Sequence, residues 1–295
     1  MLVRTAQVGC RWGAAAVVAV GVLGAVPAAA VGHGPRHADV DCRHDPSALR
    51  TAIDNAPSGA TLRVEGTCIG PFTITRDLTL IGIGHAVLDG DYADSTVTVA
   101  PASASGVRVR LACLTIIHGA PRGDGTGGGI FNRGTLTLDH STVKDNSARI
   151  GGGIDNLGTV TLTNSVVKDN TANVGGGIDN VLGTVSLTDS AVKDNTAVNG
   201  GGFNNGLSGR LTLDRSTVHH NRVTGRGGGI FNDANGSVTL MRSSVHENSA
   251  SGIPGSAGGG IFNAQDGPVT LEESRVIDNR PDNCAPRGSV LGCRG

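Results

Sequence analysis

The sequence predicts an all-β chain folded as one parallel β-helix with a short N-terminal capping helix. Three observations carry that prediction. A motif that reads Gly-Gly-Gly-Ile-Phe-Asn in its first copy begins at residues 127, 151, 175, 200, 227 and 258, so successive copies start 24 to 31 residues apart. Each copy continues with apolar residues at every second position, the period of a half-buried strand. A unit this short cannot bury its own apolar face, whereas stacked units bury a continuous one.

Each repeat divides into three short strands. After the glycine motif comes a Leu-Thr-Leu type segment, with Leu136 and Leu138 in the first copy, and then a Ser-x-Val segment. An asparagine follows three residues after that valine. Glycine or asparagine turns separate the segments, and the 3.6-residue apolar stripe of a helix is missing from the repeats. Residues 127–282 are therefore expected to form six regular coils of parallel strands about 4.8 Å apart.

Three polar positions recur once per coil and are expected to stack into columns. A repeated asparagine side chain donates to one neighbouring coil and accepts from the other, and asparagine tolerates the left-handed backbone of a sharp turn. We interpret the columns as structural, because packing alone favours identical residues in a stacked repeat. The first asparagine column is Asn132, Asn156, Asn180, Asn205, Asn232 and Asn263; the second is Asn146, Asn170, Asn195, Asn221, Asn248 and Asn279; the inward serines are Ser141, Ser165, Ser190, Ser216, Ser243 and Ser274.

The first 30 residues are expected to be a secretory signal peptide. Arg4 and Arg11 make its start positive, residues 13–26 are apolar, and the small residues 28–30 suit cleavage after Ala30. The apolar run is too short to span a bilayer comfortably and has no second one after it, so no membrane span is expected once the signal is removed. The mature protein is then secreted and extracellular, and residues 31–44 are expected to be its flexible N-terminus.

Residues 45–282 are expected to be the β-helix itself. A short amphipathic helix opens it after Asp45, Pro46 and Ser47, which suit a helix start. Terminal units of a solenoid must cover an open end, so this helix is expected to cap the first coil. It shares residues 45–120 with irregular early coils, and residues 283–295 are expected to form a C-terminal cap loop.

The cysteines cluster at the two ends of the β-helix. Cys42 and Cys68 lie near the start, and Cys284 and Cys293 lie near the end. In an oxidising compartment each pair is a candidate disulfide that would pin a terminus, although the sequence does not fix the connectivity. Cys113 lies alone between them and is expected to pack as a small apolar residue.

The residues resemble a known fold family. The Gly-Gly-Gly-Ile-Phe-Asn motif with its later asparagine turn resembles polymorphic outer-membrane protein repeats, although the second motif here starts with valine rather than phenylalanine. The stretches 56–62 and 78–84 look like the opening coils of secreted bacterial right-handed parallel β-helix proteins of the pectin-lyase-like superfold. The resemblance implies a right-handed, single-stranded β-helix and no particular activity, because this superfold hosts polysaccharide lyases, hydrolases and adhesins.

One pair of carboxylates stands out as a candidate ligand or metal site. Asp155 and Asp179 precede the first asparagine column on adjacent coils, where we expect exposed side chains about 5 Å apart. Two like charges this close either raise a pKa or hold a cation, so Ca²⁺ is a candidate cofactor beside the plainer interpretation of a solvated acidic stripe. Phe131, Phe231 and Phe262 occupy the same column and suit either a sugar-stacking face or an ordinary apolar surface.

Other polar groups have simpler interpretations. Lys144, Lys168 and Lys193 stand beside Asp145, Asp169 and Asp194 and are expected to form surface ion pairs. His219, His220 and His246 replace them further on, where zinc lacks a matching acid or cysteine spacing. The acidic loop 89–94 lacks the full EF-hand pattern and is expected to be a plain turn. The adhesive tripeptide Arg122-Gly123-Asp124 is interpreted as a chance occurrence.

Charge and motif content favour a binding scaffold over an enzyme. With 24 basic and 25 acidic residues, the chain offers no electrostatic reason to bind nucleic acid. The repeats are regular, aromatic residues are few, and no catalytic residue is recognised. We therefore expect a monomeric, secreted, non-catalytic β-helix that binds an extracellular polysaccharide or a surface partner. The alternative is a polysaccharide lyase or glycoside hydrolase on the same scaffold.

Overall fold

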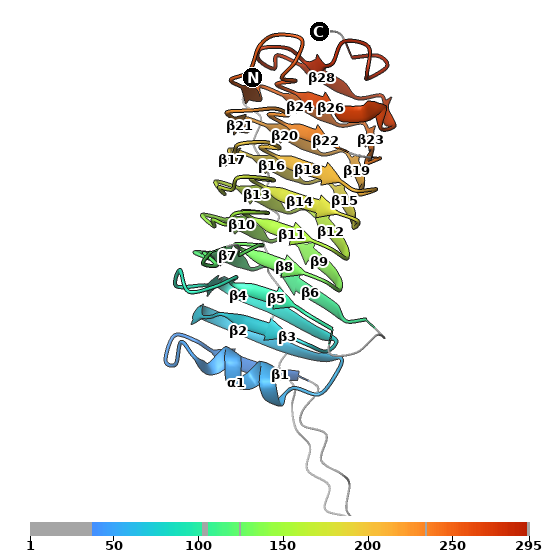
Figure 1. Ribbon diagram of the computed structural model, residues 1–295. Coiled ribbons are helices and arrows are strands. Elements are labelled where there is room, and N and C mark those ends of the chain that lie inside the picture. The colour runs from blue at the N-terminus through green and yellow to red at the C-terminus, as the bar shows by residue number, and fades with distance from the viewer. Residues whose placement is uncertain (1–36, 102–105, 124, 234, 294–295) are drawn as a thin grey trace, which may run out of the picture.

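The chain winds into a right-handed parallel β-helix of about nine turns (Figure 1). The computed structural model describes residues 37–101, 106–123, 125–233 and 235–293. The coils stack along one axis, with helix α1 (Ala48–Asn55) at one end and the C-terminal loops at the other. The predicted fold class is therefore confirmed. The predicted signal peptide lies outside the described residues.

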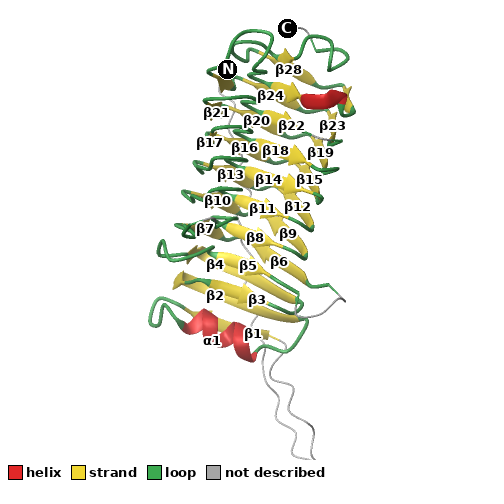
Figure 2. Cartoon of the chain, in the orientation of Figure 1, coloured by secondary structure: helices red, strands yellow, loops and turns green. Residues whose placement is uncertain are grey.

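Each regular coil contributes one strand to each of three faces, and strands dominate the coloured chain (Figure 2). The first face carries the Leu-Thr-Leu segments and is continuous with the second through the long strand β4. Its strands are β1 (His37–Asp41), β2 (Ala60–Ile69), β4 (Leu78–Asp89), β6 (Arg108–Ala112), β9 (Thr135–Asp139), β12 (Thr159–Thr163), β15 (Thr184–Thr188), β19 (Arg210–Asp214), β23 (Ser237–Met241) and β27 (Val269–Glu272).

The second face carries the Ser-x-Val segments, and the third carries the strands that follow the glycines. The second comprises β7 (Thr115–Ile117), β10 (Thr142–Lys144), β13 (Val166–Lys168), β16 (Ala191–Lys193), β20 (Thr217–His219), β24 (Ser244–His246) and β28 (Arg275–Ile277). The third comprises β3 (Phe72–Ile74), β5 (Val97–Val99), β8 (Ile130–Asn132), β11 (Ile154–Asn156), β14 (Ile178–Val181), β18 (Phe203–Gly206), β22 (Ile230–Asn232), β26 (Ile261–Asn263) and β29 (Cys284–Ala285). A small sheet of β17 (Thr196–Ala197), β21 (Arg222–Val223) and β25 (Ser249–Ala250) lies between them, and η1 (Ala264–Asp266) follows β26.

The core consists of apolar columns in register from coil to coil. Ile130, Ile154 and Ile178 pair in sequence along the third face, and all three are fully buried. Strands on the other two faces keep the same one-to-one register. A one-residue slip would turn every apolar side chain outward, so the period-two pattern in the sequence fixes this register.

The repeated glycines permit close contact between coils. A Cβ on Gly153 would lie 2.6 Å from the carbonyl oxygen of Gly177 on the next coil. The first glycine of each motif has a different role. Gly151 has a φ of 61°, and a Cβ there would lie 2.7 Å from the Cα of Asp155. This glycine lets the chain fold back against the outer side of its own third-face strand.

The predicted columns form hydrogen-bonded ladders. In the first asparagine column each Nδ2 donates to the Oδ1 of the next coil at 2.8 Å. In the second the same bond measures 2.9–3.0 Å. In the serine column each backbone N–H donates to the next serine's Oγ at 3.0–3.1 Å. These buried polar groups thus satisfy one another along the axis.

The left-handed turn positions differ from the prediction. The ladder asparagines do not have a positive φ; the residue before each member of the second column does, as in Asp145 (56°) and Asp169 (55°). The residue before each serine of the inward column also has a positive φ, as in His140 (φ 49°). This arrangement leaves the asparagine pointing inward to its ladder, while an exposed polar residue adopts the left-handed conformation.

A disulfide lies near each end of the β-helix, and a helix covers the N-terminal end. Cys42 bonds to Cys68 and Cys284 bonds to Cys293, which confirms the predicted disulfides. Helix α1 buries Leu49 and Ile53 against the first coil. Two expectations were wrong. Residues 37–41, expected to be flexible, form strand β1 and pair with β2. Cys113, expected to be a simple packed thiol, is not free but disulfide-bonded.

Candidate functional site

Asp155 and Asp179 lie in register on β11 and β14, but their side chains are not exposed as predicted. Their residues are only 4 % and 2 % accessible. They are buried because the chain segment that precedes each strand folds back over it: Gly151 lies against the backbone of Asp155, and Gly175 lies against that of Asp179. The Thr126 hydroxyl of the previous coil hydrogen-bonds Asp155. The third face is therefore covered on its outer side, so the acidic pair is enclosed rather than solvated.

Enclosure changes the protonation of the pair. Burial raises the pKa of Asp155 above its ordinary value, against a lowering contribution from the Thr126 hydrogen bond. Burial also raises the pKa of Asp179 to about 7, and the nearby Asp155 adds to the rise. Asn204 opposes it by donating from Nδ2 to Oδ1 of Asp179 at 2.6 Å. The two aspartates therefore form a buried acid pair with a proton available near neutral pH.

The phenylalanines of the same column pack with each other and with the covering loop. The rings of Phe231 and Phe262 stack with centroids 5.3 Å apart, and the Arg226 guanidinium lies 4.9 Å from the Phe262 centroid. Phe262 is only 6 % exposed. This geometry stabilises the covering loop through cation–π and aromatic contacts. It does not present an open stacking platform for a sugar.

The first face carries a feature that the sequence interpretation missed. Its outward positions hold hydroxyl side chains in register, as in Thr137, Thr161, Ser186, Thr212 and Thr239. We call this set the hydroxyl face, and none of its members is buried. The alternate threonines of the Leu-Thr-Leu segments were the available signal. Its members are Thr135, Thr137, Thr159, Thr161, Thr163, Thr184, Ser186, Thr188, Thr212, Thr239 and Thr270.

Several charged groups at the borders of the hydroxyl face form ion pairs, whereas the exposed Arg210, in register with Thr184, takes part in none of the ion pairs among the described residues. Arg110 forms an ion pair with Asp139. Further along, Arg215 contacts both Asp189 at 2.9 Å and Asp214 at 2.5 Å. At the N-terminal end a hollow of about 250 Å³ is lined by Thr79, Arg108, Arg110, Thr135 and Thr137, among other residues. Apart from Arg210, the central part of this face thus offers mainly hydroxyls and methyl groups.

The corner after the second face shows the predicted ion pairs and a histidine cluster. Lys144, Lys168 and Lys193 contact Asp145, Asp169 and Asp194 at 2.7, 2.8 and 3.3 Å. On the next coils His219 and His246 replace the lysines, and their rings stack with centroids 5.0 Å apart. Burial lowers the pKa of His219 to about 4, with further lowering from His246, His220 and Lys193.

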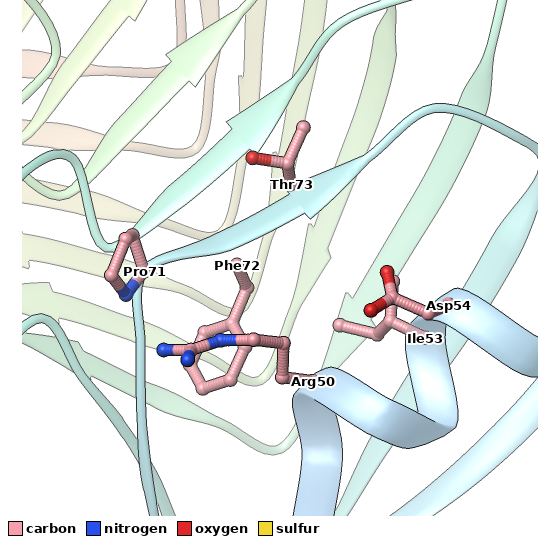
Figure 3. Close-up of a pocket in the computed structure, with 6 residues that line it drawn as sticks. All are labelled: Arg50, Ile53, Asp54, Pro71, Phe72 and Thr73. Atoms are coloured by element: carbon pink, nitrogen blue, oxygen red, sulfur yellow. The ribbon is translucent and has the colours of Figure 1, made fainter. Parts of the chain in front are cut away.

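A second hollow lies at the N-terminal end, between α1 and β3. Figure 3 shows Arg50, Ile53 and Asp54 of the helix facing Pro71, Phe72 and Thr73. Arg50 donates from Nη2 to the carbonyl oxygen of Gly70 at 2.9 Å, which ties the helix to the coil. The hollow measures about 210 Å³. This volume falls below the usual range of ligand sites, about 300–1,000 Å³, so the hollow is best understood as the seam beneath the cap.

Two motifs from the sequence remain: the acidic loop 89–94 and the adhesive tripeptide 122–124. The acidic loop is organised by turns: Asp89 accepts from the backbone N–H of Asp91 at 2.9 Å and contacts His118 at 3.1 Å. In the adhesive tripeptide, Asp124 lies outside the described residues. Within the described ranges, no three His, Cys, Asp or Glu side chains already enclose a metal position, and no helix is long and apolar enough to cross a membrane.

These features define an all-parallel, right-handed β-solenoid. No protein family and no curated protein matches the sequence. Among solved structures, the crystal structure of pectate lyase Pel9A is similar at 14% identity, with 85% of this chain and 82% of that chain covered and a TM-score of 0.48. That likeness concerns the fold alone.

Proposed function

We propose that this protein is a secreted, non-catalytic β-helix that binds a neutral extracellular polysaccharide across its hydroxyl face. The observation that carries the proposal is the in-register array of threonine and serine side chains on the first face. Neighbouring strands place hydroxyls about 4.8 Å apart, and alternate residues lie about 6.6 Å apart along a strand. Each hydroxyl both donates and accepts a hydrogen bond, as sugar hydroxyls do.

Charge and shape favour a neutral polymer. Most acids and bases bordering the hydroxyl face pair with each other, so a charged ligand would find little free counter-charge there apart from Arg210. The face extends over successive coils, which suits a long chain making many weak contacts. Two disulfides at the ends support an extracellular setting.

Binding is tested with the mature protein and a panel of insoluble neutral and uronate polysaccharides. Thr137→Lys with Thr161→Lys places bulky charges on the hydroxyl face and is expected to weaken binding at least about tenfold, or 1.4 kcal/mol. Thr171→Lys with Thr196→Lys alters exposed threonines elsewhere on the coil and serves as the matched control. Equal binding by both variants, or absence of binding to every neutral polymer, contradicts the proposal.

The buried acid pair favours the alternative of a polysaccharide lyase or hydrolase. Burial raises the pKa of Asp179 to about 7, which suits a general acid, but a substrate could reach this carboxyl only if the covering chain segment moved. The test is incubation with uronate polysaccharides and Ca²⁺ while unsaturated product absorbance is followed. Turnover that disappears in Asp179→Asn or Asp155→Asn supports an enzyme. Turnover that survives both substitutions excludes this pair as its centre.

A further inference from the structure

We propose that His220, His246 and Glu247 form a binding site for a late first-row divalent cation of the Zn²⁺ class. The three residues lie at the corner after the second face, on two adjacent coils. His219 ends β20 and His246 ends β24 in register with it, so His220 and Glu247 occupy equivalent turn positions. Both turn residues have a left-handed backbone, with φ of 56° and 54°. Imidazole nitrogens and one carboxylate form a ligand set that zinc accepts.

The distances from Glu247 to the two imidazoles are close to the edges of a zinc coordination sphere. Glu247 Oε2 lies 3.4 Å from Nε2 of His220 and 3.8 Å from Nε2 of His246. Zn–ligand bonds of about 2.0–2.1 Å at tetrahedral angles place neighbouring ligand atoms about 3.3 Å apart. The first edge already has this length, and the second must shorten by about half an ångström. The fourth position would face solvent.

Contacts on the far side of each ring direct its Nε2 toward Glu247. His220 Nδ1 lies 2.7 Å from His219 Nδ1, and His246 Nδ1 lies 3.2 Å from Ser244 Oγ. With a proton on each of these two Nδ1 atoms, His220 donates to His219 and His246 donates to Ser244. The Nε2 lone pairs of both rings are then free for a metal. Such outer hydrogen bonds select the tautomer and fix the ring in metal sites.

The neighbouring coils show why the site is confined to these two repeats. On the preceding coil the same positions hold Lys193 and Asp194, which pair with each other. On the following coil Ile277 and Asp278 take these places, and Ile277 supplies no ligand. The two coils between them carry four ligand-capable side chains: His219, His220, His246 and Glu247.

A small rearrangement completes the site. As the side chains stand, no group of three or more described His, Cys, Asp or Glu residues could hold a metal ion, so Zn²⁺ binding requires these three side chains to rotate. The side chains of His220, His246 and Glu247 are 49%, 28% and 52% exposed, so they have room to rotate inward.

The test uses the untagged mature protein, because a histidine tag would bind the same ions. Isothermal titration with ZnCl₂ is expected to show about one site per chain, and Co²⁺ is expected to give the visible absorption of a four-coordinate ion. His220→Asn, His246→Asn and Glu247→Gln should each weaken Zn²⁺ binding more than tenfold, since outer-shell changes alone cost 10–100-fold in metal affinity.

The matched control is His140→Asn. His140 also has a left-handed backbone and contacts an acid, Asp139 at 2.7 Å, but lies on another coil. It should leave Zn²⁺ affinity unchanged, and circular dichroism should show every variant folded. His219→Lys introduces the residue found at this position on the previous coil, Lys193, and removes the hydrogen bond between His219 Nδ1 and His220 Nδ1. It should weaken Zn²⁺ binding 10–100-fold. No Zn²⁺ binding, or equal binding by wild type and all three ligand variants, overturns the proposal.

Discussion

Asp155 and Asp179 stand directly opposite each other on neighbouring strands, and the fold buries both. This relationship makes stability depend on pH in the direction opposite to most carboxylates. The pKa of Asp179 is raised to about 7 from an ordinary 3.8, so between these values the folded state binds more protons than the unfolded state. The free energy of unfolding therefore falls as pH rises from about 4 through 7.

We expect Asp179→Asn to remove much of that pH dependence. Asparagine already occupies the equivalent position on the next coil at Asn204, so the substitution should be accommodated. At pH 8 it should raise the free energy of unfolding by up to about 4 kcal/mol, from three pKa units at 1.36 kcal/mol each; at pH 4 it should change little. Urea unfolding at both pH values measures this. Asp169→Asn, at an exposed turn, is the control, and an equal effect of Asp179→Asn at both pH values would contradict the assignment.

Removing one rung of the second asparagine ladder should destabilise the protein strongly. Asn195 Nδ2 donates to Asn221 Oδ1 and to the carbonyl oxygen of Val167, while its Oδ1 accepts from Asn170. Asn195→Ala leaves several buried groups without a partner, at a cost of about 3 kcal/mol or more. Thermal and urea unfolding measure the loss. Asn164→Asp, which copies Asp189 of the next coil on the surface, should change stability by less than about 0.5 kcal/mol.

The repeated glycines are expected to be irreplaceable where coils touch. In Gly153→Ala the new methyl group would lie 2.6 Å from the carbonyl oxygen of Gly177 and 2.9 Å from Val167 Cγ1. The coils must separate locally, so we expect at least about 3 kcal/mol of destabilisation or failure to fold. Gly206→Ala is the matched control, because its nearest neighbours would lie 3.9 Å away. Comparable loss of soluble protein in both variants would refute this explanation.

The fold was predictable because its determinants repeat. The recurrence of Ile130, Ile154 and Ile178 predicts one buried column. The recurrence of Asn132 on later coils predicts one ladder, since the polar groups of each coil must find hydrogen-bond partners on the next. The same regularity explains why the hydroxyl face was overlooked. Threonine is common on the outer side of strands, and only the observed register shows that these residues form a continuous surface.

The acid pair was misjudged for a different reason. Period-two alternation correctly places Asp155 and Asp179 on the outer side of their strands, but it says nothing about a chain segment that covers that side. The cover depends on the positive φ of Gly151 and Gly175, a backbone property that the sequence suggests without giving the direction of the turn. The histidine cluster likewise depends on side-chain orientation, which follows from contacts such as His246 with Ser244.

The N-terminal disulfide is expected to hold the cap on the β-helix. Cys42 and Cys68 are 26 residues apart and link the turn after β1 to β2, enclosing α1 between them. Cys42→Ala with Cys68→Ala should cost about 3–4 kcal/mol by loop-closure entropy. Because each coil of a solenoid contacts only its neighbours, the loss should appear locally. Hydrogen exchange should accelerate in β1, α1 and β2 while β14 and β18 remain protected. Cys284→Ala with Cys293→Ala should instead loosen β26 and β29, and a uniform acceleration along the chain in either variant would show that the caps act globally.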